Sequence, residues 1–290
     1  MLLRENIHMR DPFVFVEDGK CYLYGTTDPD CWHGEANGFD AFVGKDLEHF
    51  FPGRRIFSPH ASFWGTQNFW APELHKYRDS YYLFASFKAP GRRRATSILR
   101  GDNPLGPFSS WGAQTATPTE WECLDGTLYV DGDQKPWIVF CHEWVQKGGG
   151  TVCAQRLKED LTKCEGEPHT LFSAREASWT KLVHHSSGIE GHVTDGPFLH
   201  KPAGGKLWML WSSLSLSGYA IGLAISESGI ILGPWHQKAE PLFCGDGGHG
   251  MVFRGLDGVL RLSIHTPNST PYERPVFLPV QETESGFVLL

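Results

Sequence analysis

The sequence predicts an all-β fold, a five-bladed β-propeller, because five segments of the chain resemble one another. Each segment places a short polar phrase before an apolar strand, which leads through a turn with Gly or Asp into a second strand rich in Tyr, Trp or Leu. A sheet unit that recurs every 50 to 70 residues or so (about one blade) is typical of a propeller. The five phrases are Arg10-Asp11-Pro12-Phe13, Trp70-Ala71-Pro72-Glu73, Leu124-Asp125-Gly126-Thr127, Thr194-Asp195-Gly196-Pro197-Phe198 and Gly248-His249-Gly250-Met251.

The repeated polar phrases predict where a functional site lies. In a propeller the first strand of every blade lines the central axis, so equivalent positions of the five strands face one another. Each phrase carries a charged or titratable residue, and we expect these side chains to converge on one cavity. The residues are Asp11, Glu73, Asp125, Asp195 and His249. A ring of carboxylates around a funnel is an arrangement suited to catalysis.

Shorter repeats support the same architecture. Apolar residues alternate with a period of two through most of the chain, and stretches with helical periodicity are scarce. The phrase Gly44-Lys45-Asp46-Leu47 resembles Lys158-Glu159-Asp160-Leu161, and Leu105-Gly106-Pro107-Phe108 resembles Leu232-Gly233-Pro234-Trp235. We therefore expect residues 1–290 to form one propeller domain, with the irregular stretch of residues 173–193 as a loop over one face.

Composition narrows the class of protein. The net charge of −7 argues against a nucleic-acid partner. No segment approaches the roughly 18 uninterrupted apolar residues of a membrane span. The seven cysteines are an odd number without a Cys-x-x-Cys pair, so they indicate neither a disulfide framework nor a zinc site. Because the N-terminal residues lack a secretory apolar stretch, we expect a cytoplasmic protein.

Three aspartates, Asp11, Asp125 and Asp195, precede apolar strands at matching places. Aspartate is a poor strand former, and a single aspartate at such a place is most simply a turn cap. Recurrence in separate blades favours a shared pocket instead. Carboxylates that converge raise one another's pKa, which allows an acid and a base to coexist near neutral pH, as glycoside hydrolysis requires.

Taken together, the phrases resemble the motifs of the family 43 glycoside hydrolases, five-bladed propellers that cleave arabinose and xylose linkages with inversion. The resemblance covers essentially all 290 residues. Arg10-Asp11-Pro12 is similar to the first-blade motif of the family, and Trp70-Ala71-Pro72-Glu73 is similar to its second-blade motif. Gly248-His249-Gly250 resembles the fifth-blade motif.

The resemblance implies roles for individual residues. Asp11 would be the general base, and Asp125 would orient the general acid and tune its pKa. His249 would face a calcium ion or a water molecule on the axis, so a structural calcium is expected there, whereas the chemistry needs no cofactor. Arg274 resembles a late arginine that contacts substrate. The other candidate sugar-binding residues are Trp70, Glu73 and Trp144.

The fourth blade departs from the family pattern. The family presents its general acid as Glu-Gly-Pro, whereas this chain has Asp195-Gly196-Pro197, with a side chain one methylene shorter. Three residues are therefore candidates for the acid: Asp195 itself, Glu143 at the end of a blade-three strand, and Glu190 in the loop before blade four. A site that binds sugar without cleaving it is the remaining alternative.

We expect an inverting glycoside hydrolase whose partner is a pentose-containing plant oligosaccharide, because the resemblance implies a pentose substrate. An exo-acting α-L-arabinofuranosidase is favoured over a β-D-xylosidase, since many family xylosidases append a β-sandwich and none follows the fifth unit here. Two alternatives stay open. One is a non-catalytic carbohydrate-binding propeller, and the other is a related propeller that phosphorolyses sugars, for which Arg274 and the run from Arg92 to Arg94 would have to bind phosphate.

Overall fold

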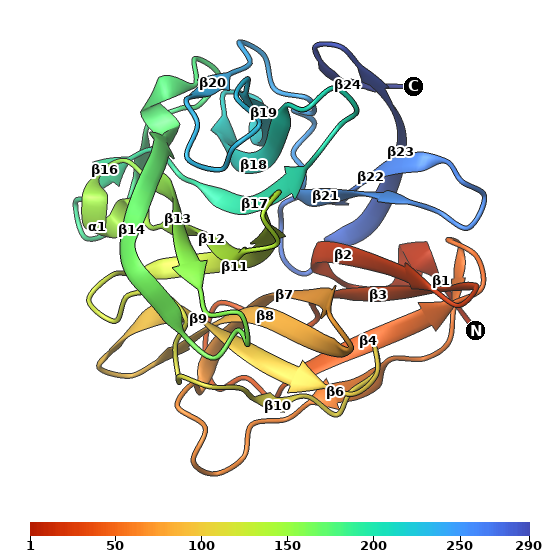
Figure 1. The fold of residues 1–290 in the computed structure, drawn as a ribbon. Coiled ribbons are helices and arrows are strands. Elements are labelled where there is room, and N and C mark those ends of the chain that lie inside the picture. Colours follow the sequence, from red (N-terminus) through yellow and green to blue (C-terminus); the bar gives the residue numbers. More distant parts are fainter.

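A computed structural model describes all 290 residues and arranges the chain as five antiparallel sheets around a central axis (Figure 1). In blades two to five the strands follow one another in sequence order across the sheet. The innermost strands β2, β7, β11, β17 and β21 surround the centre of the molecule (Figure 1). The predicted all-β, five-bladed propeller is confirmed.

The first three blades occupy the N-terminal part of the chain. Blade one consists of β2 (Arg10–Glu17), β3 (Lys20–Thr26), β4 (Phe39–Gly44), β5 (His49–Phe50) and β1 (Leu2–Leu3), with β6 (Arg54–Phe57) paired to β4. Blade two consists of β7 (Gln67–Tyr77), β8 (Ser80–Ala89), β9 (Arg92–Gly101) and β10 (Ser109–Ser110). Blade three consists of β11 (Cys123–Val130), β12 (Pro136–His142), β13 (Thr151–Leu157) and β14 (Cys164–Ser173).

The remaining blades and the short elements follow. Blade four consists of β17 (Asp195–His200), β18 (Leu207–Ser215), β19 (Gly218–Ser226) and β20 (Trp235–Gln237). Blade five consists of β21 (Gly248–Arg254), β22 (Leu260–Thr266), β23 (Arg274–Thr283) and β24 (Gly286–Leu289). The short helices are η1 (Arg4–Asn6), α1 (Trp144–Lys147) and η2 (Ala174–Glu176). The stretch expected to be an irregular loop contains a small hairpin, β15 (Val183–His184) with β16 (Glu190–Gly191).

Aromatic side chains fill the wedges between blades. Between blades one and two, five phenylalanines form a cluster with ring centroids 4.8–6.1 Å apart. They are Phe39, Phe57, Phe63, Phe69 and Phe87. Each buried ring of this kind contributes about 1.5–3 kcal/mol through apolar burial. Such packing gives the strands around the axis a rigid support, which a catalytic site needs.

The ring closes where blade five meets blade one, which lie side by side in Figure 1. Residues before β2 make this joint: the Met9 N–H donates to the Glu273 carbonyl at 3.2 Å, and Arg4 Nη1 donates to the Pro275 carbonyl at 3.0 Å. In the opposite direction, Arg274 Nε donates to the Glu5 carbonyl at 2.9 Å. The closure therefore depends on side-chain and loop contacts rather than on a strand shared by both ends of the chain.

No helix in the structure has the length and apolar character needed to cross a membrane. All seven cysteines are free thiols.

The short phrases that repeat in the sequence occupy matching positions in different blades. The two acidic phrases directly follow the third strands β4 and β13, and the two Leu-Gly-Pro phrases precede the outermost strands β10 and β20.

Candidate active site

Every innermost strand is interrupted by a bulge close to its start. In blade one the pairing with the second strand skips between Arg10 and Phe13, and equivalent register shifts occur in the other four blades. One residue in each bulge adopts a left-handed φ between 46° and 55°. These residues are Asp11, Ala71, Asp125, Gly196 and His249. Because a bulge re-aims the side chain it carries, the same backbone device presents five positions to the axis.

The structural repeat differs from the predicted one in two blades. Asp11, Asp125 and His249 do occupy equivalent bulge positions. Asp195 still pairs with the second strand and lies one residue before its bulge, whereas Glu73 lies after its own. The predicted equivalence of Asp195 and Glu73 with the other three is therefore wrong. Residue type near a strand start does not reveal which residue forms the bulge.

Four of the five bulge N–H groups donate to a side chain on the second strand of the neighbouring blade. Each acceptor residue lies on the second strand of the blade that contains it. There it pairs with the innermost-strand residue that comes just before the bulge of that same blade. The pairs are Asp11 with His265, Ala71 with Thr26, Asp125 with Ser86 and His249 with Ser212, at 2.8–3.0 Å. A buried N–H without an acceptor costs about 1–3 kcal/mol, so these bonds hold the bulges in register from blade to blade.

The bulge of blade four is the exception. The residue at the acceptor position in blade three is Cys141, and a thiol is a weak acceptor. The Gly196 N–H instead donates to Asp125 Oδ2 at 3.0 Å. This bond ties the carboxylate of Asp125 to the strand that carries Asp195.

A cavity of about 300 Å³ lies where the bulges meet. It brings together most of the residues predicted for the site. The predicted residues that line it are Asp11, Trp70, Asp125, Glu143, Trp144, Asp195 and His249. Further lining residues include Arg10, Trp32, Tyr219 and Asn268, for which the sequence suggested no role in the site, and Arg94, which the sequence suggested only for the phosphate-binding alternative.

Three predicted residues lie elsewhere. Glu73 is buried near the axis but does not line the cavity, and its Oε2 is 3.2 Å from His75 Nε2. Glu190 lies on the β15–β16 hairpin with its side chain 56% exposed and ion-paired with His184 at 2.8 Å. Arg274 donates to backbone carbonyls at the ring closure. The structure therefore does not bring Glu190 or Arg274 into the site.

His249 lies between two of the aspartates. Its Nδ1 is 3.3 Å from Asp11 Oδ1 and 3.6 Å from Asp125 Oδ2. Burial alone would lower the pKa of His249, but Asp11, Asp125 and Asp195 outweigh it, so the pKa of His249 is raised. The ring packs closely on Gly196, where an added Cβ would lie 2.7 Å from His249 Cδ2. The ring of carboxylates therefore favours the positively charged form of the histidine.

The residues around His249 do not fit the calcium ion expected there. Calcium takes six to eight oxygen ligands, whereas His249 offers a nitrogen that already faces Asp11. No group of three or more His, Cys, Asp or Glu side chains is arranged to hold a metal ion. These residues therefore offer no set of oxygen ligands for a cation beside His249.

Asp11 is held as a carboxylate. Burial by itself would raise its pKa, but His249 and Arg10, together with a hydrogen bond from the Thr26 hydroxyl at 2.8 Å, lower the pKa of Asp11 below its usual value. His265 is neutral because burial lowers its pKa to about 4. Its Nδ1 accepts the Asp11 N–H at 3.0 Å, so the ring proton is on Nε2.

Asp125 and Asp195 behave in the opposite way. Burial raises the pKa of Asp125 to about 7 and that of Asp195 to about 6, against the opposing effect of His249. The charge of Asp195 raises the pKa of Asp125 further, and the charge of Glu143 raises that of Asp195. The Tyr219 hydroxyl donates to Asp195 Oδ2 at 3.0 Å and orients it. This pair therefore retains a proton near neutral pH, whereas Asp11 does not.

Glu143 lines the cavity as an ion pair. It follows β12, and its Oε1 accepts a hydrogen bond from Arg94 Nε at 2.5 Å. The Arg94 guanidinium lies 3.7 Å from the centre of the Trp70 ring. Glu143 Oε1 is therefore engaged in an ion pair with a guanidinium. Of the two acid candidates in the cavity, Asp195 is the one placed to hold a proton.

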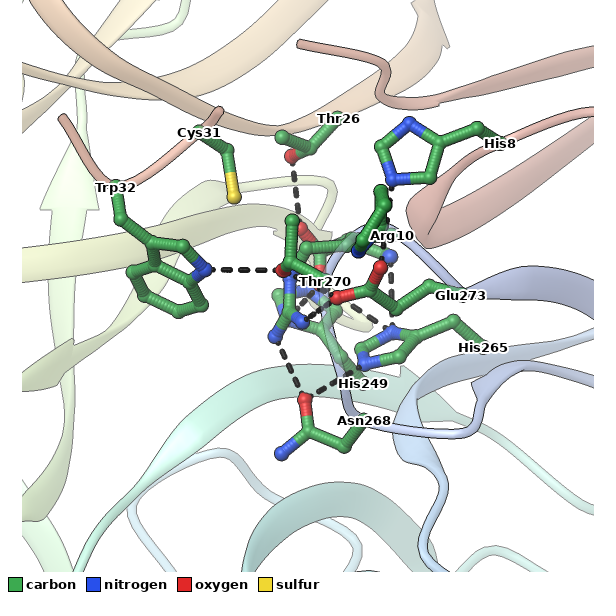
Figure 2. A network of polar contacts seen from close by, with 12 residues as sticks. His8, Arg10, Thr26, Cys31, Trp32, His249, His265, Asn268, Thr270 and Glu273 are labelled. Atoms are coloured by element: carbon green, nitrogen blue, oxygen red, sulfur yellow. Dashed lines mark hydrogen bonds and ion pairs between the residues drawn. The ribbon is translucent and has the colours of Figure 1, made fainter. Parts of the chain in front are cut away.

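A network of polar residues supports the side of the cavity around Asp11 (Figure 2). Arg10 donates to Glu273 Oε1 and, through Nη2, to Asn268 Oδ1 at 2.8 Å. His265 Nε2 lies 3.3 Å from the same oxygen. Because both contacts fix the amide of Asn268, its Nδ2 is left for the cavity. Arg10 also stacks over Trp32 at 4.9 Å.

Sequence reasoning assigned no role to these supporting residues, although some signals were present. Arg10 stands in the first-blade phrase, next to the predicted base, and Asn268 lies just before the arginine that was predicted to contact substrate. Tyr219 and Arg94 lie on a third strand of a blade, at β19 and β9, in no recurring phrase. Only their place in the fold brings them to the axis.

Comparisons with known proteins match the chain to one family. The family model for glycosyl hydrolases family 43 matches residues 6–284. A solved structure of an endo-arabinase from Bacteroides thetaiotaomicron VPI-5482 superposes with a TM-score of 0.90 at 42% identity, covering 98% of each chain. An endo-1,4-beta-xylanase structure from the same organism has a TM-score of 0.77 at 22% identity, covering 98% of this chain and 94% of its own, which is a likeness of fold.

More distant sequences point the same way. The extracellular exo-alpha-(1->5)-L-arabinofuranosidase ArbA of Cellvibrio japonicus (strain Ueda107) is 20% identical over 254 residues, which are 81% of this chain and 68% of that protein. An extracellular endo-alpha-(1->5)-L-arabinanase 1 of Bacillus subtilis (strain 168) is 23% identical over 146 residues, covering 47% of this chain and 44% of that protein.

Proposed function

This chain belongs to family 43 of the glycosyl hydrolases, and on that premise we propose that it removes α-L-arabinofuranosyl units from the ends of pentose-containing oligosaccharides, with inversion. Relatives with exo and with endo activity on α-1,5-linked arabinan support arabinose as the sugar. The cavity of about 300 Å³ is at the lower end of the range for small-ligand sites. A site of this size suits a chain end better than the middle of a long polymer.

One observation carries the reaction type: carboxylates of opposite protonation state line a single cavity. Inverting hydrolysis needs a base to activate water and an acid to protonate the leaving oxygen. Asp11, with its lowered pKa, is the base. Asp195, with a pKa raised to about 6 and an oriented carboxyl, is the acid. Asp125 shares the proton and holds the strand of the acid through the Gly196 N–H.

The residues act in a defined sequence in this proposal. Asp11 takes a proton from water as the water oxygen attacks the anomeric carbon. Asp195 gives its proton to the glycosidic oxygen as the bond to the leaving sugar breaks. His249, positively charged between Asp11 and Asp125, stabilises the ionised carboxylates at both ends of this transfer. The reaction consumes one water and leaves Asp11 protonated and Asp195 ionised, and proton exchange with solvent resets both.

Endo-acting cleavage of arabinan is the second candidate. It is favoured by the endo-arabinase structure, which is 42% identical over nearly the whole chain. The product pattern distinguishes the two: a chain-end enzyme releases only arabinose from debranched arabinan from the first minutes, whereas an endo enzyme releases a series of oligosaccharides. Activity on a β-D-xyloside alone would show that the sugar is xylose and not arabinose.

The testing experiment measures release from chromogenic α-L-arabinofuranoside and β-D-xyloside, and the anomer of the first product by NMR. Wild type is compared with Asp195→Asn, Glu143→Gln and Glu190→Gln. We expect an inverted product from the arabinofuranoside, loss of activity in Asp195→Asn, and full activity in the Glu190→Gln control, whose side chain is exposed. Sugar binding without product in the wild type would instead favour a carbohydrate-binding propeller.

A further inference from the structure

The wall of the cavity near Asp195 holds a donor and an acceptor that the protein itself does not use. Glu143 and Arg94 are each 8% exposed and joined by one hydrogen bond, Nε to Oε1. Glu143 Oε2 and Arg94 Nη2 have no hydrogen-bond partner in the protein, and neither is among the buried atoms without one. Since both side chains line the cavity, these two atoms are open to it.

The arginine has a second unmet donor. Arg94 Nη1 is buried without any acceptor, although a buried polar atom is normally paired. The centre of the guanidinium lies over the Trp70 ring, 3.7 Å from the ring centroid. The protein thus leaves the charge of Arg94 incompletely paired, and a ligand acceptor at the accessible Nη2 would offset part of the cost of burying the group.

The pair is fixed before any ligand arrives. The Arg94 N–H donates to Glu122 Oε2 at 2.8 Å, and the Glu143 N–H donates to the Glu122 carbonyl at 2.8 Å. One residue, Glu122, therefore holds the backbone of both partners. Preorganisation of this kind lowers the entropic cost of binding, so the donor and acceptor are presented at a set spacing.

Arg94 and Glu143 lie on the side of the cavity where the leaving group must be. The segment after Glu143 lies against the segment that leads into Asp195, since the Gly150 N–H donates to the His192 carbonyl at 2.7 Å. The base Asp11 has different neighbours: its N–H donates to His265 Nδ1 at 3.0 Å, and the Thr26 hydroxyl donates to its Oδ2 at 2.8 Å. The acid protonates the oxygen of the departing sugar, so that sugar must lie on the side of Asp195.

We propose that Arg94 and Glu143 form the binding site for the leaving sugar, in which Glu143 Oε2 accepts from one hydroxyl and Arg94 Nη2 donates to its neighbour. This inference rests on the proposed function. It adds the class of ligand that this wall of the cavity would bind, namely a sugar with two adjacent free hydroxyls. The Trp144 ring, which also lines the cavity beside Glu143, offers the apolar surface on which a sugar ring packs. Glu143 is a binding residue here, not the acid.

The test compares two leaving groups on the same glycone. α-1,5-linked arabinobiose carries a leaving sugar, whereas an aryl α-L-arabinofuranoside with a nitrophenol leaving group does not. For Glu143→Gln and Arg94→Lys we expect kcat/KM on arabinobiose to fall about 10- to 100-fold, the usual loss for a hydrogen bond to a charged group. On the aryl substrate both variants should lose clearly less activity than on arabinobiose, because the missing contact is absent there from the start. Rates are compared at a pH below the alkaline limb, since Glu143→Gln also removes a charge that raises the pKa of Asp195.

Three results would overturn the subsite. An equal loss on both substrates, with an unchanged melting temperature, would show that the pair shapes the site in general. A Glu143→Gln variant whose aryl-glycoside rate becomes steeply dependent on the pKa of the leaving phenol would identify Glu143 as the acid. Unchanged arabinobiose kinetics would show that the pair does not touch substrate.

Failure of the proposed function is separable from failure of the subsite. A wild-type protein that cleaves neither substrate contradicts the hydrolase proposal. Calorimetric titration of arabinobiose into wild type, Glu143→Gln and Arg94→Lys then tests the subsite on its own. Weaker binding in both variants upholds it, and equal affinity in all three rejects it. Glu190→Gln is the matched control, a glutamate outside the cavity that should change neither measurement.

Discussion

The first and third blades carry an aspartate in the same backbone conformation, but the pKa values of the two carboxyls are shifted in opposite directions. Asp11 and Asp125 both lie in a bulge with a φ of 55°, both are buried, and both face His249 Nδ1. Yet the pKa of Asp11 is lowered and that of Asp125 is raised to about 7. The difference cannot come from burial or from the local backbone, which are alike.

The neighbours supply the difference. Beside Asp11 are a guanidinium on Arg10, a hydroxyl donor on Thr26 and the neutral ring of His265. Beside Asp125 is another carboxylate, Asp195, and apart from His249, which both aspartates face, the compensating contact is the Gly196 N–H. The repeat thus positions carboxylates, and the residues of adjoining blades decide which one is a base and which retains a proton.

Removing the carboxylate of blade one should have the largest effect. Asp11→Asn keeps the shape of the side chain but cannot take a proton from water, so we expect kcat to fall by about 10⁴-fold, the upper end for a lost general base. Circular dichroism should show an unchanged fold. The measurement is arabinofuranoside hydrolysis with saturating substrate. A variant that retains more than a tenth of wild-type activity would contradict the role of Asp11.

The equivalent change in blade three should be milder and should alter the pH dependence. Asp125→Asn still offers an oxygen to the Gly196 N–H, but it removes the ionisable partner of Asp195. We expect kcat to fall by about 100-fold, the lower end for acid–base groups. Because repulsion between the two carboxyls is lost, the pKa of Asp195 should drop and the alkaline limb should move to lower pH. An alkaline limb in its wild-type position would show that the two groups titrate independently.

The wild-type pH profile tests the comparison without mutation. The base must be ionised, and since the pKa of Asp11 is lowered, the acid limb should lie below the usual aspartate range. The acid must be protonated, so kcat/KM should decline as the pH rises through about 6 to 7, where Asp195 and Asp125 lose the shared proton. Initial rates between pH 3 and 9 measure both limbs. Full activity maintained to pH 9 would exclude this pair as the proton donor.

Much of this arrangement could be predicted from the sequence, and the limit has a physical cause. The propeller and the aspartates Asp11, Asp125 and Asp195 were predicted because alternation, turns and recurring phrases are local properties of the chain. Glu190 was a reasonable acid candidate by proximity in sequence, but it lies on the β15–β16 hairpin and its side chain is exposed. Five residues of sequence separation do not fix the direction of a side chain.

Contacts between blades were beyond the reach of sequence. A left-handed φ at Asp11 is tolerated by aspartate better than by most residues, but nothing in the sequence marks it. Likewise, the partnership of Arg94 with Glu143 joins residues 49 positions apart on different blades. The supporting residues of the site are found only once the blades are placed around their axis, whereas the residues in each repeated phrase are found without it.

The smallest predicted effect concerns the one junction that breaks the pattern of hydrogen bonds between blades. In Cys141→Ser the hydroxyl would stand where Ser86 and Ser212 stand in their blades and could accept the Gly196 N–H. Asp125 would then lose a bond that lowers its pKa. We expect the alkaline limb to move slightly upward, and kcat to fall about two- to fivefold, in line with one modest hydrogen bond.

The reciprocal substitution gives this prediction its control. Ser212→Cys weakens the acceptor for the His249 N–H but leaves the bond between Gly196 and Asp125 in place, so it should lower thermal stability without moving the alkaline limb. If both variants shift the profile alike, the effect is general loosening around the axis. If only Cys141→Ser shifts it, the cysteine at this junction is what leaves the Gly196 N–H to Asp125, and a single acceptor on a second strand adjusts the pKa of the blade-three carboxyl.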